Sequence, residues 1–206
     1  MSLQIQTIPC GEIQANAYLV YRPERDDCVI IDPGDEFPKL KRALGDRRLA
    51  AILLTHAHFD HIMAARPLSD ATGAPVYAAA EDLPMLNDPA LNGLKSLMYI
   101  DAMPEPPIAA QAYGATLSAA GLDFAVLSTP GHTKGSVCLY LKDEAALFSG
   151  DTLFCAGFGR MDLPGGSHLD MRNSLRALFE LPPEVKVYPG HGMATAIGEE
   201  KRRYRL

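Results

Sequence analysis

The sequence has no long apolar run. Its longest strongly apolar stretch covers only residues 49–54, whereas a helix that spans a bilayer needs about 20 apolar residues. The first residues, MSLQIQTIPC, also lack the charged start and long apolar centre of a secretory signal peptide. We therefore expect a protein without a transmembrane helix or signal peptide, located in the cytoplasm and without a membrane partner.

Paired cysteines are also missing. The four cysteines stand at positions 10, 28, 138 and 155, and no two of them form a C-x-x-C pair. Scattered cysteines of this kind argue against a zinc–thiolate site and give little support to a disulfide framework. We expect buried free thiols, because free cysteine often behaves as a small apolar residue.

An excess of basic residues is absent as well. The 25 acidic side chains outnumber the 19 basic ones, which gives a formal net charge of −6. A nucleic-acid binder usually carries a basic face, and the one basic cluster lies at the end of the chain: Lys201, Arg202, Arg203 and Arg205. The balance of charge therefore predicts no nucleic-acid partner.

The sequence does contain enough apolar residues for a substantial core. Of its 206 residues, 48% are hydrophobic, and a single domain of this length buries roughly 70% of the surface that its unfolded chain exposes. There are no internal repeats or low-complexity stretches. We predict one folded domain over residues 1–206.

Short strand-like runs alternate with a few helical segments. The runs are rich in Val, Ile, Leu, Tyr and Phe and are bounded by Gly, Pro or Asp, as strands usually are. They predict eight strands, at residues 18–21, 28–32, 49–55, 76–78, 124–128, 137–141, 146–148 and 185–188.

Apolar spacing predicts three helices, at about residues 36–44, 64–72 and 169–181. Asp35 can cap the start of the first helix, and Ser167 and Asp170 suit a capping box at the start of the third. Pro67 is tolerated only in a first turn, so the second helix cannot begin much earlier than predicted. Residues 56–61 are therefore expected on a strand end and loop ahead of that helix.

Residues 84–107 differ in character from the rest of the chain. They contain five of the sixteen prolines together with apolar residues such as Leu94, Leu97 and Met98. Such a stretch suits a long loop or short helices packed across the mouth of a site, or a surface connection that covers part of the core. The sequence leaves both interpretations open.

Five of the six histidines fall in three short clusters, each at the end of a predicted strand. The clusters are T-H-A-H-F-D-H at 55–61, T-P-G-H-T at 129–133 and P-G-H-G at 189–192, and a fourth strand end carries S-G-D-T at 149–152. Strand ends that meet in space can bring polar side chains to one site. His168 belongs to no motif, and we expect it to be a surface residue.

The first cluster has the composition of a metal site. His56 and His58 are two residues apart, so in an extended chain they point the same way and can bind one ion. Asp60 and His61 follow directly and are placed for a second ion. Imidazole and carboxylate are ligands that zinc and iron accept, and a run of buried polar groups would be costly without a metal. We therefore predict metal ligands rather than a solvated histidine-rich loop.

Together these motifs resemble the metallo-β-lactamase superfamily. Within it, the chain is most similar to glyoxalase II (hydroxyacylglutathione hydrolase) and its shorter bacterial relatives. The matching pieces are residues 32–34, 56–61, 129–136, 149–154, 159–160 and 189–192. The resemblance implies an α/β fold in four layers, an αββα sandwich in which two mixed β-sheets lie face to face with helices outside.

The resemblance also implies two divalent metal ions, with zinc expected and iron or manganese as alternatives. Seven side chains would hold them: His56, His58 and His132 on the first ion, Asp60, His61 and His191 on the second, and Asp151 between the two, which would share a hydroxide. Asp60 and Asp151 are thus the expected catalytic carboxylates. Asp32 would orient a ligand from outside, unless its Asp-Pro-Gly sequence only forms a turn.

The expected substrate is a small anionic thioester such as S-lactoylglutathione. Two metal ions can lower the pKa of a bound water to about 7, and a thiol, with a pKa of about 8.5, leaves without a strong acid. An amide would need its nitrogen protonated, and no acid is available beyond Asp60. By the resemblance, Arg160 stands where a basic residue contacts glutathione, and we expect help from Lys201 and Arg202 in binding a carboxylate.

Other classes share part of this pattern. A persulfide dioxygenase has the same fold with one iron and a Gly-Arg-x-Asp segment like residues 159–162. A tRNA-processing nuclease shares H-x-H-x-D-H but does not fit the acidic charge, and a metal-free scaffold does not fit seven filled ligand positions. The P-G-H-G sequence at 189–192 favours the hydrolase, because glycine lets the backbone approach the metals closely, whereas the dioxygenases read Pro-Ala-His there.

We expect a monomer or a small homo-oligomer.

Overall fold

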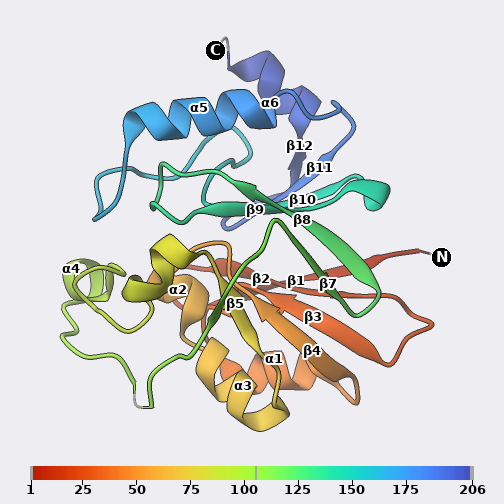
Figure 1. The fold of residues 1–206 in the computed structure, drawn as a ribbon, viewed down its shortest axis with the longest axis vertical. Helices are drawn as coiled ribbons and strands as arrows, with labels where there is room; N and C mark the ends of the chain where they lie inside the picture. The colour runs from red at the N-terminus through yellow and green to blue at the C-terminus, as the bar shows by residue number, and fades with distance from the viewer. Residues whose placement is uncertain (1, 105, 205–206) are drawn as a thin grey trace.

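The computed structural model describes residues 2–104 and 106–204. It contains two mixed six-stranded sheets that face each other (Figure 1). Across the first sheet the order is β1 (Gln4–Cys10), β2 (Ala15–Tyr21), β3 (Asp27–Ile31), β4 (Arg48–Leu53), β5 (Val76–Ala78) and β6 (Gln111–Ala112). Across the second it is β12 (Thr195–Ala196), β11 (Lys186–Pro189), β10 (Ala146–Gly150), β9 (Val137–Leu141), β8 (Leu122–Ser128) and β7 (Thr116–Ala119).

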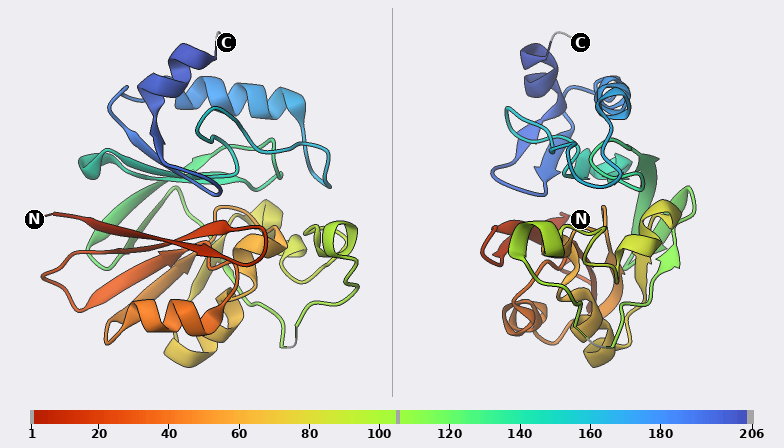
Figure 2. Two further views of the ribbon diagram at one scale, coloured as in Figure 1. Left: turned by 180° about the vertical axis from the view of Figure 1, so that it is seen from behind. Right: turned by 90° about the vertical axis from the view of Figure 1, so that its left-hand side faces the viewer.

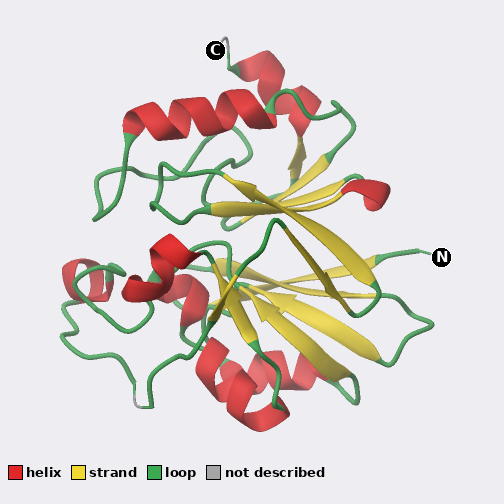
Figure 3. Ribbon diagram, in the orientation of Figure 1, coloured by secondary structure: helices red, strands yellow, loops and turns green. Residues whose placement is uncertain are grey.

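Helices cover the outer face of each sheet (Figures 2 and 3). α1 (Phe37–Leu44) and α3 (Ala65–Thr72) pack on the first sheet, and α5 (His168–Leu178) and α6 (Ile197–Arg203) pack on the second. This arrangement confirms the expected αββα sandwich of four layers. Within the described residues, no helix is long and apolar enough to cross a membrane.

Alternation along the strands explains the layers. In β9, Cys138 and Tyr140 pack against the outer helices, whereas Val137, Leu139 and Leu141 fill the space between the sheets. A strand that is buried on both faces reads as a nearly continuous apolar run, which is why the sequence predicts β9 directly. Each large apolar side chain that is buried in this way stabilises the fold by about 1.5–3 kcal/mol. The four cysteines are free thiols, as expected, but only Cys10, Cys28 and Cys138 are buried, whereas Cys155 is half-buried.

The starts of two predicted helices have different outcomes. α1 begins at Phe37, and its N-cap, Glu36, lies in the left-handed region (φ 54°) without a capping bond from its side chain. The predicted Asp35 cap is therefore wrong, because the Asp35 carboxylate accepts a hydrogen bond from the neighbouring N–H of Glu36 and, among the described residues, from no N–H of the first turn. At the start of α5 the cap is confirmed, since Ser167 Oγ accepts from the N–H of Asp170.

The prediction that residues 56–61 all precede helical structure is wrong. A one-turn helix, α2 (Phe59–Ile62), already contains Asp60 and His61. Phe59 and Ile62 are three residues apart and are both buried, and side chains at this spacing share one face of a helical turn. The burial of Phe59 and Ile62 on one face therefore favours a helical turn over the residues that carry two of the predicted ligands.

The proline-rich segment begins in the 3-10 helix η1 (Ala80–Met85) and continues through α4 (Leu94–Met98). Met85 and Leu86 are buried in the core between the first sheet and its helices. Leu97 and Met98 instead line the cavity described below. The segment is thus both a cover for the core and a wall of the site, so each interpretation is correct for part of it.

Candidate metal centre

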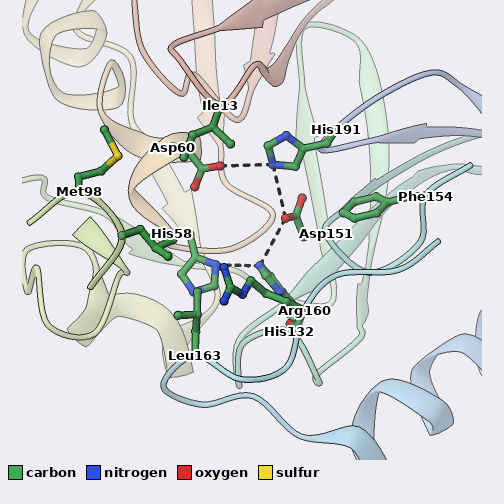
Figure 4. A pocket seen from close by; sticks show the side chains of 11 residues that line it. Ile13, His58, Asp60, Met98, His132, Asp151, Phe154, Arg160, Leu163 and His191 are labelled. Carbon is green, nitrogen blue, oxygen red and sulfur yellow. Dashed lines mark hydrogen bonds and ion pairs between the residues drawn. The ribbon is translucent and has the colours of Figure 1, made fainter. Parts of the chain in front are cut away.

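The seven predicted ligands meet where strands of both sheets end at one edge of the molecule. The side chains come from five places: His56 and His58 after β4, Asp60 and His61 in α2, His132 after β8, Asp151 after β10, and His191 after β11. Figure 4 shows five of them around one cavity. Residues as far apart in sequence as His61 and His191, 130 positions, are therefore neighbours in the fold.

His56, His58 and His132 form the first ligand set. One ligand atom from each lies within 4.8 Å of the others, and all three residues are buried. The closest pair is Nδ1 of His58 and Nε2 of His132, which are 2.7 Å apart. The three rings thus turn nitrogen atoms toward one point, as a shared cation requires.

Asp60, His61 and His191 form the second ligand set, whose ligand atoms also lie within 4.8 Å of one another. Nε2 of His61 is 3.6 Å from Oδ2 of Asp60 and 3.4 Å from Nε2 of His191. Nε2 of His191 is 3.3 Å from the same Asp60 oxygen. This set combines one carboxylate with two imidazoles.

Asp151 lies between the two sets. Its Oδ2 is 3.5 Å from Nε2 of His132 in the first set and 3.6 Å from Nε2 of His191 in the second. Its Oδ1 is 3.5 Å from Nε2 of His61. One carboxylate therefore faces both clusters, which is the position of a shared ligand.

Hydrogen bonds behind the ligands fix the orientation of their rings. Asp32 accepts from the backbone N–H of Thr55 (2.7 Å) and from its hydroxyl (2.6 Å), and lies 3.1 Å from Nδ1 of His61. Nδ1 of His132 lies 2.7 Å from the carbonyl oxygen of Arg160. Each contact occupies Nδ1 and leaves Nε2 toward the centre, a pattern typical of metal-bound histidine. The Asp-Pro-Gly segment therefore does more than form a turn.

The residues fit divalent cations. Three of their buried polar atoms have no hydrogen-bond partner within the described structure: Nε2 of His56, Nε2 of His58 and Oδ1 of Asp151. An unpaired buried polar atom costs about 1–3 kcal/mol. Burial lowers the pKa of His56, and it lowers the pKa of His58 to about 3. Both imidazoles are thus neutral, the form that binds a metal.

Carboxylates surround the histidine His61 of the second ligand set. Burial alone would lower the pKa of His61, but the carboxylates of Asp60, Asp151 and Asp32 outweigh it and raise that pKa to about 10. Burial would raise the pKa of Asp60, but the charge of His61 and the hydrogen bond to His191 hold it below its ordinary value. A cation here would replace the proton of His61, because metal binding releases protons from its ligands.

The centre opens into a cavity of about 530 Å³ (Figure 4). Its walls combine five of the predicted ligands with Arg160 and five apolar residues: Ile13, Leu97, Met98, Phe154 and Leu163. In Figure 4, Ile13 and Met98 lie on the side of Asp60, and Phe154 lies beside Asp151. The space is that of a small-molecule site.

The basic residues predicted to bind substrate have different positions. Arg160 lines the cavity, but its guanidinium donates two hydrogen bonds to Asp162, each 2.7 Å long. Lys201 donates to the carbonyl oxygen of Phe179, at 2.7 Å, because α6 packs on the outer side of the second sheet. Neither Lys201 nor Arg202 lines the cavity, so the structure does not bring the C-terminal cluster to the site.

Asp82, in η1, is a buried carboxylate that the sequence analysis missed. Its Oδ2 accepts from the N–H of Ala57 (3.1 Å) and the hydroxyl of Thr133 (2.7 Å), and its Oδ1 accepts from the N–H of Gly135 (2.8 Å). Ala57 stands between two ligands of the first set, and Thr133 follows the third. Asp82 thus connects both loops that carry the first set. It belongs to no short sequence motif, so the sequence alone does not identify it.

Asp82→Asn should weaken metal binding by about 10–100-fold, the usual cost of losing a group that orients ligands. The amide nitrogen cannot accept the two hydrogen bonds that Oδ2 accepts now, so the two loops lose a common anchor. Competition with a metal chelator measures the affinity, and Asp143→Asn, an exposed change in the same charge, is the matched control. Unchanged affinity in a folded Asp82→Asn protein would show that the anchor is not needed.

Known proteins resemble this chain along nearly its whole length. Residues 10–191 match the family described as the Metallo-beta-lactamase superfamily. The chain is 38% identical to "Probable metallo-hydrolase YqgX" of Bacillus subtilis, over 94% of this chain and 92% of that one. It is 34% identical to "Hydroxyacylglutathione hydrolase GloC" of Haemophilus influenzae, over 97% and 96% of the two chains.

Solved structures show the same fold. BLEG-1 B3 metallo-β-lactamase has a TM-score of 0.90 at 40% identity, over 97% of each chain. TTHA1623 in a di-iron-bound form has a TM-score of 0.85 at 40% identity, over 97% of this chain and 98% of that one. ETHE1 from Myxococcus xanthus has a TM-score of 0.74 at 30% identity, over 97% and 82%. Motifs, fold and relatives agree: the chain belongs to the metallo-β-lactamase superfamily.

Proposed function

We propose that the chain is a metal-dependent hydrolase of thioesters, such as S-lactoylglutathione, that uses two divalent ions, with zinc as the first candidate and iron or manganese as alternatives. The observation that carries the proposal is Asp151, whose two oxygens face both ligand sets. The hydroxyacylglutathione hydrolase of Haemophilus influenzae, 34% identical, supports the substrate class. The di-iron form of TTHA1623, 40% identical, supports two ions.

The ligands divide as the two clusters suggest. His56, His58 and His132 would hold one ion, Asp60, His61 and His191 the other, and Asp151 both. When bound, such ions lower the pKa of a water molecule and polarise a carbonyl oxygen. The protein supplies the rest: Asp32 and the carbonyl of Arg160 hold the imidazole rings in place, and apolar side chains form the walls of the cavity beside the ligands.

The protonation of Asp60 favours a thioester over an amide. The pKa of Asp60 lies below its ordinary value, because the charge of His61 and the hydrogen bond to His191 outweigh its burial. An ionised Asp60 has no proton to give to a leaving group. A thiolate needs none, since its conjugate thiol has a pKa of about 8.5, whereas an amine does.

A persulfide dioxygenase is the second candidate, because that class carries a Gly-Arg-x-Asp segment like residues 159–162. The position of His191 argues for the hydrolase. Its Nε2 lies with Asp60 and His61 in a second ligand set, which a centre with one iron does not need.

Parallel assays separate the two candidates. Zinc-loaded and iron-loaded protein would each receive S-lactoylglutathione, with thiol release measured, and glutathione persulfide, with oxygen uptake measured. We expect thiol release from the thioester. Oxygen uptake with persulfide, without thiol release under either metal, would contradict the proposal.

A further inference from the structure

A second cavity adjoins the cavity over the metal centre. This side cavity has a volume of about 170 Å³ and is bounded by the turn between β1 and β2 and by α2. Ile13, Asp60 and Met98 line both cavities. The side cavity therefore lies next to Asp60, a ligand of the second set, and is a pocket that the hydrolysis itself does not require.

The walls of the side cavity are largely apolar. Phe59 and Met63 line the side cavity together with Ile13 and Met98, which it shares with the main cavity. Leu97 and Leu163 of the main cavity lie close to Phe59 of the side cavity: the Cδ1 atoms of all three lie 3.6–3.7 Å from the place where a Cβ on Gly93 would stand. Side chains from four separate segments thus form one apolar surface next to the centre.

The same surface reaches the outside of the protein. Ile13 is 41% exposed and Leu97 is 36% exposed, although both are large apolar side chains. Tyr99 and Ile100, which directly follow Met98, are also exposed, as is Met193, two residues after His191. Ile13 and Leu97 thus line the cavity and stay exposed, as apolar side chains of a ligand-binding groove do.

Arginine and lysine side chains are scarce around the two cavities. Among the described residues that line the two cavities, Arg160 is the one cation, and both of its hydrogen bonds to a carboxylate go to Asp162. The hydrogen bond from Arg160 lowers the pKa of Asp162 to about 2, so the pair stays charged on both sides. Glu12 and Asp35 add acidic groups at the side cavity. Apart from the proposed metal ions, a substrate carboxylate therefore meets no arginine or lysine in these cavities that lacks a carboxylate partner.

We propose that the side cavity binds an uncharged apolar arm of the thioester, so that the enzyme prefers apolar thioesters to the charged glutathione thioesters. The inference rests on the proposed thioester hydrolysis and specifies its substrate class. The arm can belong to the acyl group or to the thiol, since both flank the carbonyl carbon, and the two sources are separated by experiment.

Two series of substrates test the preference. Acyl thioesters of N-acetylcysteamine, from acetyl to octanoyl, vary the acyl arm, and S-alkyl thioacetates vary the thiol arm. In one series, each added methylene should raise kcat/KM by about two- to fourfold until the side cavity is full. With the same acyl group, the glutathione thioester should be no better a substrate than the neutral one.

Variants link the preference to the side cavity. Met98→Gln places a polar amide of similar size on the wall and should lower the ratio of octanoyl to acetyl kcat/KM by about tenfold or more. Met98→Leu keeps an apolar side chain of similar volume and should keep the ratio. Asp162→Asn releases Arg160 and should raise kcat/KM on the glutathione thioester, relative to the neutral one, by up to about fivefold.

The outcomes separate this inference from the function on which it rests. Hydrolysis of the acetyl thioester with flat or falling kcat/KM in both series would overturn the apolar arm and leave the hydrolase. A steep series that Met98→Gln does not change would also overturn it, because the arm would then bind elsewhere. Absence of hydrolysis for every thioester under every metal would overturn both proposals.

Discussion

Replacing Asp151 by alanine should lower kcat/KM on a thioester by at least about 10³-fold, or about 4 kcal/mol of transition-state stabilisation. The reason is geometric, since Asp151 is the carboxylate that faces both ligand sets, at 3.5 Å from His61 and from His132. Its loss removes a ligand from two ions at once. Steady-state kinetics, together with elemental analysis of the purified variant, measures the effect.

Asp32→Asn is the matched comparison for this variant. The Asp32 carboxylate contacts Nδ1 of His61, the ring nitrogen that points away from the centre. The backbone of Asp32 lies in the left-handed region (φ 48°), where asparagine is tolerated better than alanine. Its replacement should cost only about 10–100-fold, as for other groups that orient a ligand. An Asp151→Ala loss no larger than the Asp32→Asn loss would contradict the shared position of Asp151.

Gly190→Ala should cost about 100-fold or more in kcat/KM, although it adds one methyl group. A Cβ at residue 190 would lie 2.1 Å from Oδ1 of Asp151 and 2.8 Å from Cε1 of His61. The shared ligand or its neighbour would have to move, and small displacements at a reacting centre can cost two orders of magnitude. Kinetics and metal content after loading are the measurements.

Gly192→Ala provides the control for Gly190→Ala. Gly192 has a φ of 76°, and a Cβ there would meet nothing within 4 Å. This change should reduce stability by about 1 kcal/mol, through backbone strain, and affect activity far less. Equal activity losses in the two variants would show that strain of the turn, and not space at Asp151, is what matters.

Gly190 and Gly192 have different roles in the structure, and only one of these roles follows from the P-G-H-G sequence. From the sequence, the turn was attributed to the conformational freedom of glycine. In the structure that reason applies to Gly192, which has a positive φ, whereas Gly190 has no positive φ and is needed because Asp151 occupies the space of a side chain. A sequence shows which residue is small, but only the fold shows what fills the place of its missing Cβ.

The strands were predictable where burial on two faces left an apolar run, as in β9, and not where pairing alone forms the strand. β1 has the sequence QIQTIPC, with mostly exposed residues and a proline, and it is a strand because it pairs with β2 along its whole length. β6 and β12 have two residues each. Such elements depend on neighbours that are distant in sequence, so local patterns do not reveal them.

The candidate site was predictable to the extent that its ligands stand in short motifs. Asp82 stands alone in the sequence, and its three hydrogen-bond donors are at least 25 residues away. The pairing of Arg160 with Asp162 could have been predicted from the sequence, because residues two apart in an extended chain point the same way. An acidic residue at 162 could therefore have been expected to occupy the guanidinium.

The most direct test of the account is a metal titration that follows activity. Protein freed of metal would receive increasing amounts of Zn²⁺, and thiol release from a neutral thioester would be measured at each step. Seven ligands in two sets predict that bound zinc and activity both level off at two equivalents per chain. Activity that is complete at one equivalent, or that never appears, would contradict a binuclear thioester hydrolase.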